Sequence, residues 1–201
     1  MAFPILAGFM AFIIILTVIL KGNSKKESEA EADFWKRENE ANSTRRQDIS
    51  TLDYIVIDKD ALPFGCTEDA DIRLVEEEVL ALSEKKILNF EGVSNTELKE
   101  RYGAPNLDIL IECDEAFINL CRLLNSWGTM LFDIEMLEES RLVLEFAVEI
   151  KSDIAATYTT LAKIYKRLKL KEKLSSLERK AAALNSASRD NVLKKLETYI
   201  A

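Results

Sequence analysis

The stretch Leu-Leu-Asn-Ser-Trp-Gly-Thr-Met-Leu, residues 123–131, has a counterpart in Thr-Tyr-Thr-Thr-Leu-Ala-Lys-Ile-Tyr, residues 157–165. The two stretches lie 34 residues apart, and in each a small residue, Gly128 or Ala162, stands three places before a large apolar one. The same offset continues downstream, where it pairs Ile134 with Leu168, Ser140 with Leu174, Ala147 with Ala181 and Ile150 with Leu184. A small residue at a crossing point lets two antiparallel helices approach closely, so this period predicts two successive helical hairpins.

The period resembles that of the tetratricopeptide repeat, whose helical hairpins stack into solenoids. The matching residues are Leu124, Trp127, Gly128, Leu131 and Ala147 in a first repeat, about 121–154, and Tyr158, Leu161, Ala162, Tyr165 and Ala181 in a second, about 155–188. The chain differs from the family pattern at Ser140 and Leu174, where alanine is usual, at Glu178, where an aromatic residue is usual, and at Ser152 and Ser186, which stand in place of the closing proline.

Two repeats bury too little surface to be stable alone, so further helices are expected at both ends of the stack. With no Gly or Pro between Leu107 and Trp127, the apolar pattern predicts one long helix that runs into the first repeat, and residues 189–200 are predicted to form a capping helix. Apolar stripes and caps also predict helices at 68–89 and 94–102. The predicted fold class is therefore all-α: a single N-terminal transmembrane helix and a tetratricopeptide-like domain, residues 68–201, with about seven helices.

Residues 1–21 are predicted to be a transmembrane anchor. Residues 2–20 carry no charge and, at 1.5 Å per residue, reach about 30 Å as a helix, which is the thickness of a bilayer core. A cleaved signal peptide is the alternative, but no basic residue precedes the run and Val18-Ile19-Leu20 is not a small-residue cleavage site. Because the flanking lysines follow the run, we expect the N-terminus outside and the C-terminal domain in the cytoplasm.

Residues 22–48 are highly charged and are predicted to form a solvated juxtamembrane stalk that is partly helical. An interfacial segment with Trp35 at the lipid headgroups is the alternative. Residues 49–67 are predicted to be extended, because Tyr54-Ile55-Val56-Ile57 is β-branched and aromatic and Pro63-Phe64-Gly65 ends it. This segment is expected either to lie along the helical body as a strap or to occupy its groove as an internal ligand.

The resemblance implies a partner-binding groove on the polar surface of the first helix of each repeat. Its residues are Arg122, Asn125, Thr129 and Asp133 from the first repeat, and Thr159, Lys163, Lys166 and Arg167 from the second. Asn125, Thr129 and Thr160 stand where some family members hold a C-terminal carboxylate with a Lys/Asn/Arg clamp, so that clamp is not expected. Basic residues dominate 163–180, which is typical of a solvated face or of a dock for an acidic peptide or anionic lipid headgroups.

The composition argues against several classes of function. A net charge of −8 disfavours nucleic-acid binding, and the absence of histidine removes the commonest general base and metal ligand. We find no catalytic or cofactor motif and expect neither an enzyme nor a cofactor nor a bound metal. The three cysteines form no CxxC pair, which suits a reducing compartment. The sequence thus predicts a membrane-anchored adaptor that binds protein or peptide partners; a self-associating membrane scaffold and a receptor in protein targeting or import are the alternatives, with the oligomeric state left open.

Overall fold

The computed structural model describes residues 29–200, so the predicted anchor at 1–21 lies outside the described residues. Within 29–200 the chain is all-α and has no strand, which confirms the predicted fold class at this level. No helix in that part of the chain is both long and apolar enough to cross a bilayer. The described chain divides into two compact units: residues up to 47 with 95–106, and residues 48–94 with 107 onward.

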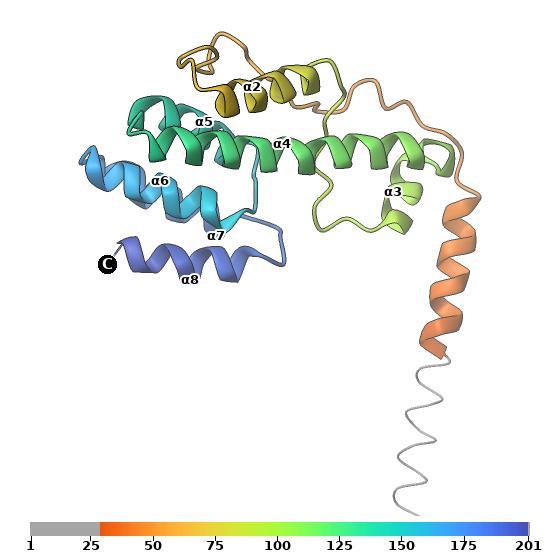
Figure 1. The fold of residues 1–201 in the computed structure, drawn as a ribbon. Coiled ribbons are helices and arrows are strands. Elements are labelled where there is room, and N and C mark those ends of the chain that lie inside the picture. Colours follow the sequence, from red (N-terminus) through yellow and green to blue (C-terminus); the bar gives the residue numbers. More distant parts are fainter. Residues whose placement is uncertain (1–28, 201) are drawn as a thin grey trace, which may run out of the picture. The chain divides into compact units, whose positions relative to one another are not determined.

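The larger unit contains the predicted hairpins. Its helices are α2 (Ala70–Leu82), α4 (Leu107–Asp133), α5 (Leu137–Glu149), α6 (Ala155–Arg167), α7 (Lys171–Ala182) and α8 (Arg189–Ile200). Helix α4 packs against α2, α5 and α6, and α6 in turn packs against α5, α7 and α8 (Figure 1). The long helix that leads into the first hairpin and the last helix at 189–200 are both confirmed.

Helices α4 and α5 cross tightly at Gly128. A Cβ atom added there would lie 2.5 Å from Cγ of Leu144, a distance that side chains do not tolerate. The hydroxyl of the buried Ser140 donates a hydrogen bond of 2.5 Å to the carbonyl oxygen of Gly128 at the same crossing. The small residue at position 128 and the serine at position 140 therefore act together to bring the two backbones close.

Helices α4 and α6 end in the same turn. Glu135 (φ 64°) and Lys169 (φ 57°) adopt the left-handed conformation, and each is followed by a residue whose N–H bonds back to the carbonyl five residues earlier. Met136 donates to Leu131 at 2.9 Å, and Leu170 donates to Tyr165 at 2.8 Å. This hydrogen-bond pattern satisfies carbonyl groups that the helix end leaves unpaired. The ends of α4 and α6 lie at the 34-residue offset of the sequence, and α5 ends in the same turn, with Lys151 at φ 66° and the Ser152 N–H donating to the Ala147 carbonyl at 2.9 Å.

The extended segment covers one side of α4. Its buried residues Ile57 and Leu62 belong to a core shared with α2, α4 and α5, and the Phe64 ring lies 4.8 Å from that of Trp127. The groove positions Asn125 and Thr129 are each two residues from Trp127, about 200° around the helix. The segment therefore lies away from the predicted groove, in agreement with a structural strap rather than an internal ligand.

The predicted helix at 68–89 is too long. Helix α2 ends at Leu82, where the Ser83 hydroxyl donates to the Leu80 carbonyl at 2.6 Å. Beyond this point the chain is not helical, and its backbone pairs with other segments: Ile55 donates to the Ile87 carbonyl at 2.9 Å, and Leu88 donates to Cys113 at 3.2 Å. Leu88, whose spacing had extended the predicted helix, and its neighbour Ile87 are buried where these segments pack together.

The smaller unit joins the helix at residues 29–42 to α3 (Asn95–Tyr102) and the short 3₁₀ helix η1 (Ala104–Asn106). The buried Lys99 bonds to Glu38 and, at 2.7 Å, to Asn42. Asn106 is fully buried and donates to the carbonyls of Gln47 (2.8 Å) and Tyr102 (2.7 Å). This part of the predicted stalk is therefore not wholly solvated, because the buried polar groups of residues 95–106 need its acceptors.

Candidate functional site

The eight predicted groove residues all lie on α4 or α6. The residues on α4 are three or four positions apart, and those on α6 are four, three and one apart, so each set lies along one side of its helix. Arg122, Asp133, Lys163, Lys166 and Arg167 are exposed, whereas Asn125, Thr129 and Thr159 are half-buried. We call the surface that these residues form, together with the adjoining side of α8, the groove face.

Two of the predicted residues make hydrogen bonds within the domain, and the hydroxyl of a third is buried. The Thr157 hydroxyl donates to Oδ1 of Asn125 at 3.1 Å, which links α6 to α4, and the Thr159 hydroxyl donates to the carbonyl of Ala156 at 3.1 Å. The Thr129 hydroxyl oxygen is buried and has no hydrogen-bond partner in the described residues. Asn125 therefore has a structural role, because its hydrogen bond to Thr157 links α4 to α6.

At the C-terminal end of α6, the structure gathers a cationic patch, which we define as Lys163, Lys166 and Arg167. The Arg167 guanidinium lies 5.0 Å from the centre of the Phe132 ring. The Lys163 ammonium lies 6.0 Å from the same ring and 5.7 Å from that of Tyr199 on α8. Arg167 also forms an ion pair of 2.6 Å with Glu135, but both side chains are exposed and such pairs are worth only about 0–1 kcal/mol.

The aromatic rings of this patch were not among the predicted groove residues. Phe132 lies three residues after Thr129, so helical spacing alone predicts that it lies on the same side of α4 as the groove residues. Tyr199 lies on the last helix, and no local sequence signal pairs it with Lys163; the packing of α8 on α6 brings them together.

A pocket of about 370 Å³ lies at the other end of α6. Its lining consists of Glu91, Asp114, Phe117, Ile118, Cys121, Arg122, Asp153 and Ile154, and we call it the acidic pocket. The three carboxylates come from three separate segments, namely the loop after α2, helix α4 and the loop before α6. Ile118 is 45 % exposed, which is unusual for a large apolar side chain and gives the pocket an accessible apolar wall.

Hydrogen bonds hold these carboxylates in place. Oδ1 of Asp114 accepts from the Phe90 N–H at 3.0 Å, and Oδ2 of Asp153 accepts from the Ser186 hydroxyl at 2.7 Å. Ser186 is one of the two serines found where the tetratricopeptide pattern has proline. The loops approach so closely that a Cβ on Gly92 (φ 76°) would lie 2.8 Å from the Asn185 carbonyl oxygen.

The acids of the pocket differ in their affinity for protons. Burial raises the pKa of Glu91, and Asp153 and Asp114 raise it further. For Asp153, burial also acts to raise the pKa, but hydrogen bonds from Ser186 and Ser188 outweigh it and the pKa is lowered. Glu91 therefore takes up a proton before Asp153 as the pH falls. No group of acidic or cysteine side chains within 29–200 has the arrangement of a metal site.

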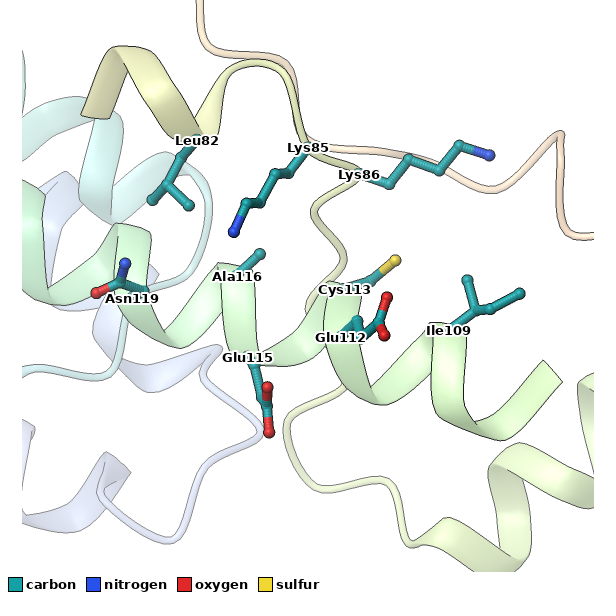
Figure 2. A pocket seen from close by; sticks show the side chains of 9 residues that line it. All are labelled: Leu82, Lys85, Lys86, Ile109, Glu112, Cys113, Glu115, Ala116 and Asn119. Carbon is teal, nitrogen blue, oxygen red and sulfur yellow. The ribbon is translucent and has the colours of Figure 1, made fainter. Parts of the chain in front are cut away.

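A larger hollow of about 600 Å³ lies between α4 and the segment after α2 (Figure 2). Lys85 reaches toward α4 at this hollow, whereas Lys86 points away and stands 5.1 Å from the Tyr54 ring. Glu112 and Glu115 line the same hollow. Because both charge signs are mixed along its walls, the hollow favours no one ligand charge.

Comparisons with protein families, with curated proteins and with solved structures give no match for this chain. The functional argument therefore depends on the residues of the groove face.

Proposed function

We propose that this chain is a non-enzymatic, tetratricopeptide-like adaptor that is held in a membrane by residues 1–21 and binds cytoplasmic protein or peptide partners through its groove face. The observation that carries the proposal is the exposed cationic patch beside the rings of Phe132 and Tyr199. Supporting it are the 34-residue period of the sequence and the matching turns that end α4 and α6.

The patch suits an acidic peptide. An arginine side chain binds a carboxylate through two parallel hydrogen bonds, and neighbouring lysines add attraction to further acidic residues. Its internal partner Glu135 is 68 % exposed and can be displaced at little cost in free energy. The rings beneath the cations offer apolar area to the stem of a bound side chain, as in many protein interfaces.

Charge reversal tests the proposal. In the full-length protein, the triple variant Lys163→Glu, Lys166→Glu and Arg167→Glu should lose partners that are captured by chemical cross-linking in native membranes and identified by mass spectrometry. The matched control reverses three exposed basic residues of α7, Lys171, Arg179 and Lys180, and changes the net charge by the same amount. Capture that is equal in the two variants would contradict the groove face as the binding surface.

The anchor and its orientation need their own measurement. We expect the full-length protein to resist extraction from membranes by alkaline carbonate. A cysteine introduced at the exposed Ala187 should stay unlabelled by a membrane-impermeant thiol reagent in intact cells and become labelled after lysis. Labelling in intact cells would show that the domain lies on the outer side.

A further inference from the structure

Residues 53–58 of the strap form a short extended edge whose backbone is bonded to the rest of the domain on one side. The Ile55 N–H donates to the Ile87 carbonyl oxygen at 2.9 Å, which fixes that side against the segment after α2. In an extended chain the backbone groups of successive residues point to opposite sides. The N–H and carbonyl of Val56 therefore point away from Ile87, and neither has a hydrogen-bond partner within residues 29–200.

The Val56 side chain is also open to solvent. It is 77 % exposed, the highest value among the large apolar residues of the described chain, whereas its neighbour Ile57 is buried in the core. Proteins commonly protect an open edge with a proline, a bulge or a central charge, because its unpaired backbone groups attract a further strand. Residues 54–57, Tyr-Ile-Val-Ile, contain no proline and no charge, so this edge can pair with another extended chain.

The charges at the two ends of the edge indicate which chain fits it. Asp53 lies three residues before Val56, and Lys59 lies three residues after it. When two copies pair antiparallel with Val56 opposite Val56, each Asp53 stands opposite the Lys59 of the other copy, and opposite charges at such positions stabilise paired strands. In-register parallel pairing would place like charges opposite one another, which is unfavourable. The edge is therefore complementary to a second copy of itself.

Both end residues are available for this pairing. Asp53 is exposed and forms no ion pair within the described residues. Lys59 lies 3.5 Å from Glu84, but the two side chains are 52 % and 80 % exposed, so Lys59 can exchange Glu84 for another carboxylate at little cost. The Asp58 carboxylate is used inside the strap, where it accepts from the Asp60 N–H at 3.0 Å and closes the extended segment.

We infer that two copies of this chain associate through their straps, as an antiparallel pair of residues 53–59 centred on Val56. In this arrangement the two Val56 residues exchange both N–H···O=C bonds, and the Asp58 N–H of each copy donates to the Tyr54 carbonyl of the other. The contact is small beside an ordinary protein interface, so the dimer is weak and depends on concentration. The pairing uses none of the groove residues, so it goes beyond the proposed function and leaves the groove face free.

A cysteine at position 56 tests the pairing. In a hydrogen-bonded antiparallel pair the two Cα atoms lie about 5.5 Å apart, which a disulfide can span. The full-length variant Val56→Cys with Cys66→Ser, whose other two cysteines are buried, is oxidised with copper phenanthroline in mild detergent at several protein concentrations. We expect a covalent dimer whose yield rises with concentration. The matched control, Ala187→Cys with Cys66→Ser, places a cysteine at another exposed position and should give at least about fivefold less dimer.

Charge exchange distinguishes this register from random collision. In the Val56→Cys background, Asp53→Lys and Lys59→Asp each place like charges opposite one another twice in the dimer, so each should lower the yield at least about threefold. The double variant restores the opposite charges, and its yield should return to within about twofold of the parent. Both positions are exposed, so the far-ultraviolet circular dichroism spectrum should not change.

The unmodified chain gives an independent readout. Its Val56 amide has no acceptor within residues 29–200, so it should exchange with deuterium more slowly as the protein concentration rises. An exchange rate that ignores concentration would overturn the inference, as would a Val56→Cys dimer yield no higher than that of the control, or a double charge variant no better than the single ones. In native membranes, a cross-link from position 56 to a different protein in place of a second copy would also overturn it.

Discussion

Replacing Gly128 with alanine tests the helix crossing on which the first hairpin depends. The added Cβ would meet Leu144, whose Cγ lies 2.5 Å away and which is fully buried. Overpacking of this kind costs about 1–3 kcal/mol, and the better helix propensity of alanine returns about 1 kcal/mol. Because the contact involves Cγ as well as the end of the side chain, we expect a net loss of about 1–2 kcal/mol in the free energy of unfolding.

The second substitution, Leu144→Ala, removes the atoms that the new methyl group would meet. Alone it should cost about 2–5 kcal/mol because it leaves a cavity. In that background Gly128→Ala no longer meets an obstacle and should stabilise the protein by about 0.5–1 kcal/mol through helix propensity. The effect of one substitution therefore changes sign with the residue opposite it.

Urea denaturation of the four proteins, followed by far-ultraviolet circular dichroism, measures this cycle. The full-length chain in a mild detergent is the sample, and the slope of unfolding free energy against urea must agree among the variants for the comparison to hold. We expect a coupling free energy of about 2 kcal/mol. Additive effects, meaning that Gly128→Ala lowers the free energy of unfolding equally with leucine or alanine at position 144, would refute the crossing at Gly128.

Three further predictions concern single side chains. Burial alone would raise the pKa of Glu145, but hydrogen bonds from Lys173 (2.6 Å) and Tyr165 (2.8 Å) outweigh it and lower the pKa. The ionised Glu145 carboxylate therefore stabilises the fold fully above its unfolded-state pKa of about 4.3, and this stabilisation is lost as the pH falls through the lower folded-state pKa. Glu145→Gln should reduce the loss of unfolding free energy in this acidic range, as measured by urea denaturation at several pH values. An unchanged pH dependence would contradict this prediction. Lys169 has a left-handed backbone (φ 57°), so Lys169→Gly should stabilise by about 0.5–1 kcal/mol in urea denaturation, and a loss would count against the turn assignment. Burial raises the pKa of Cys121 to about 12, so its thiol should resist a thiol-specific reagent at pH 8 in the folded protein and react in urea; modification without urea would contradict its burial.

Helical periodicity gave reliable predictions where packing follows local spacing. The continuous apolar face from Leu107 onward predicted α4 as one helix, and the 34-residue offset predicted two hairpins with small residues at matching places. The same reasoning failed after Leu82. Leu88 extended the predicted helical stripe, but the chain there is not helical, and Ile87 and Leu88 are buried where its backbone bonds to the strap and to α4.

The candidate site was predictable only in part. The cations of α6 follow from their spacing on one helix, and Phe132 could have been added on the same ground. Asn125 has the right position, but its hydrogen bond to Thr157 gives it a structural role that its residue type does not reveal.

The sequence by itself determined that the described chain is helical, that one long helix runs from Leu107 into the first hairpin, and which residues repeat with a 34-residue period, because these properties depend on backbone preferences and on spacing along one helix. Only the tertiary structure decided that Glu91, Asp114 and Asp153 share one pocket, and that Tyr199 stands beside Lys163. These residues are far apart in the chain, and the packing of α4, α6 and α8 with their loops sets their distances.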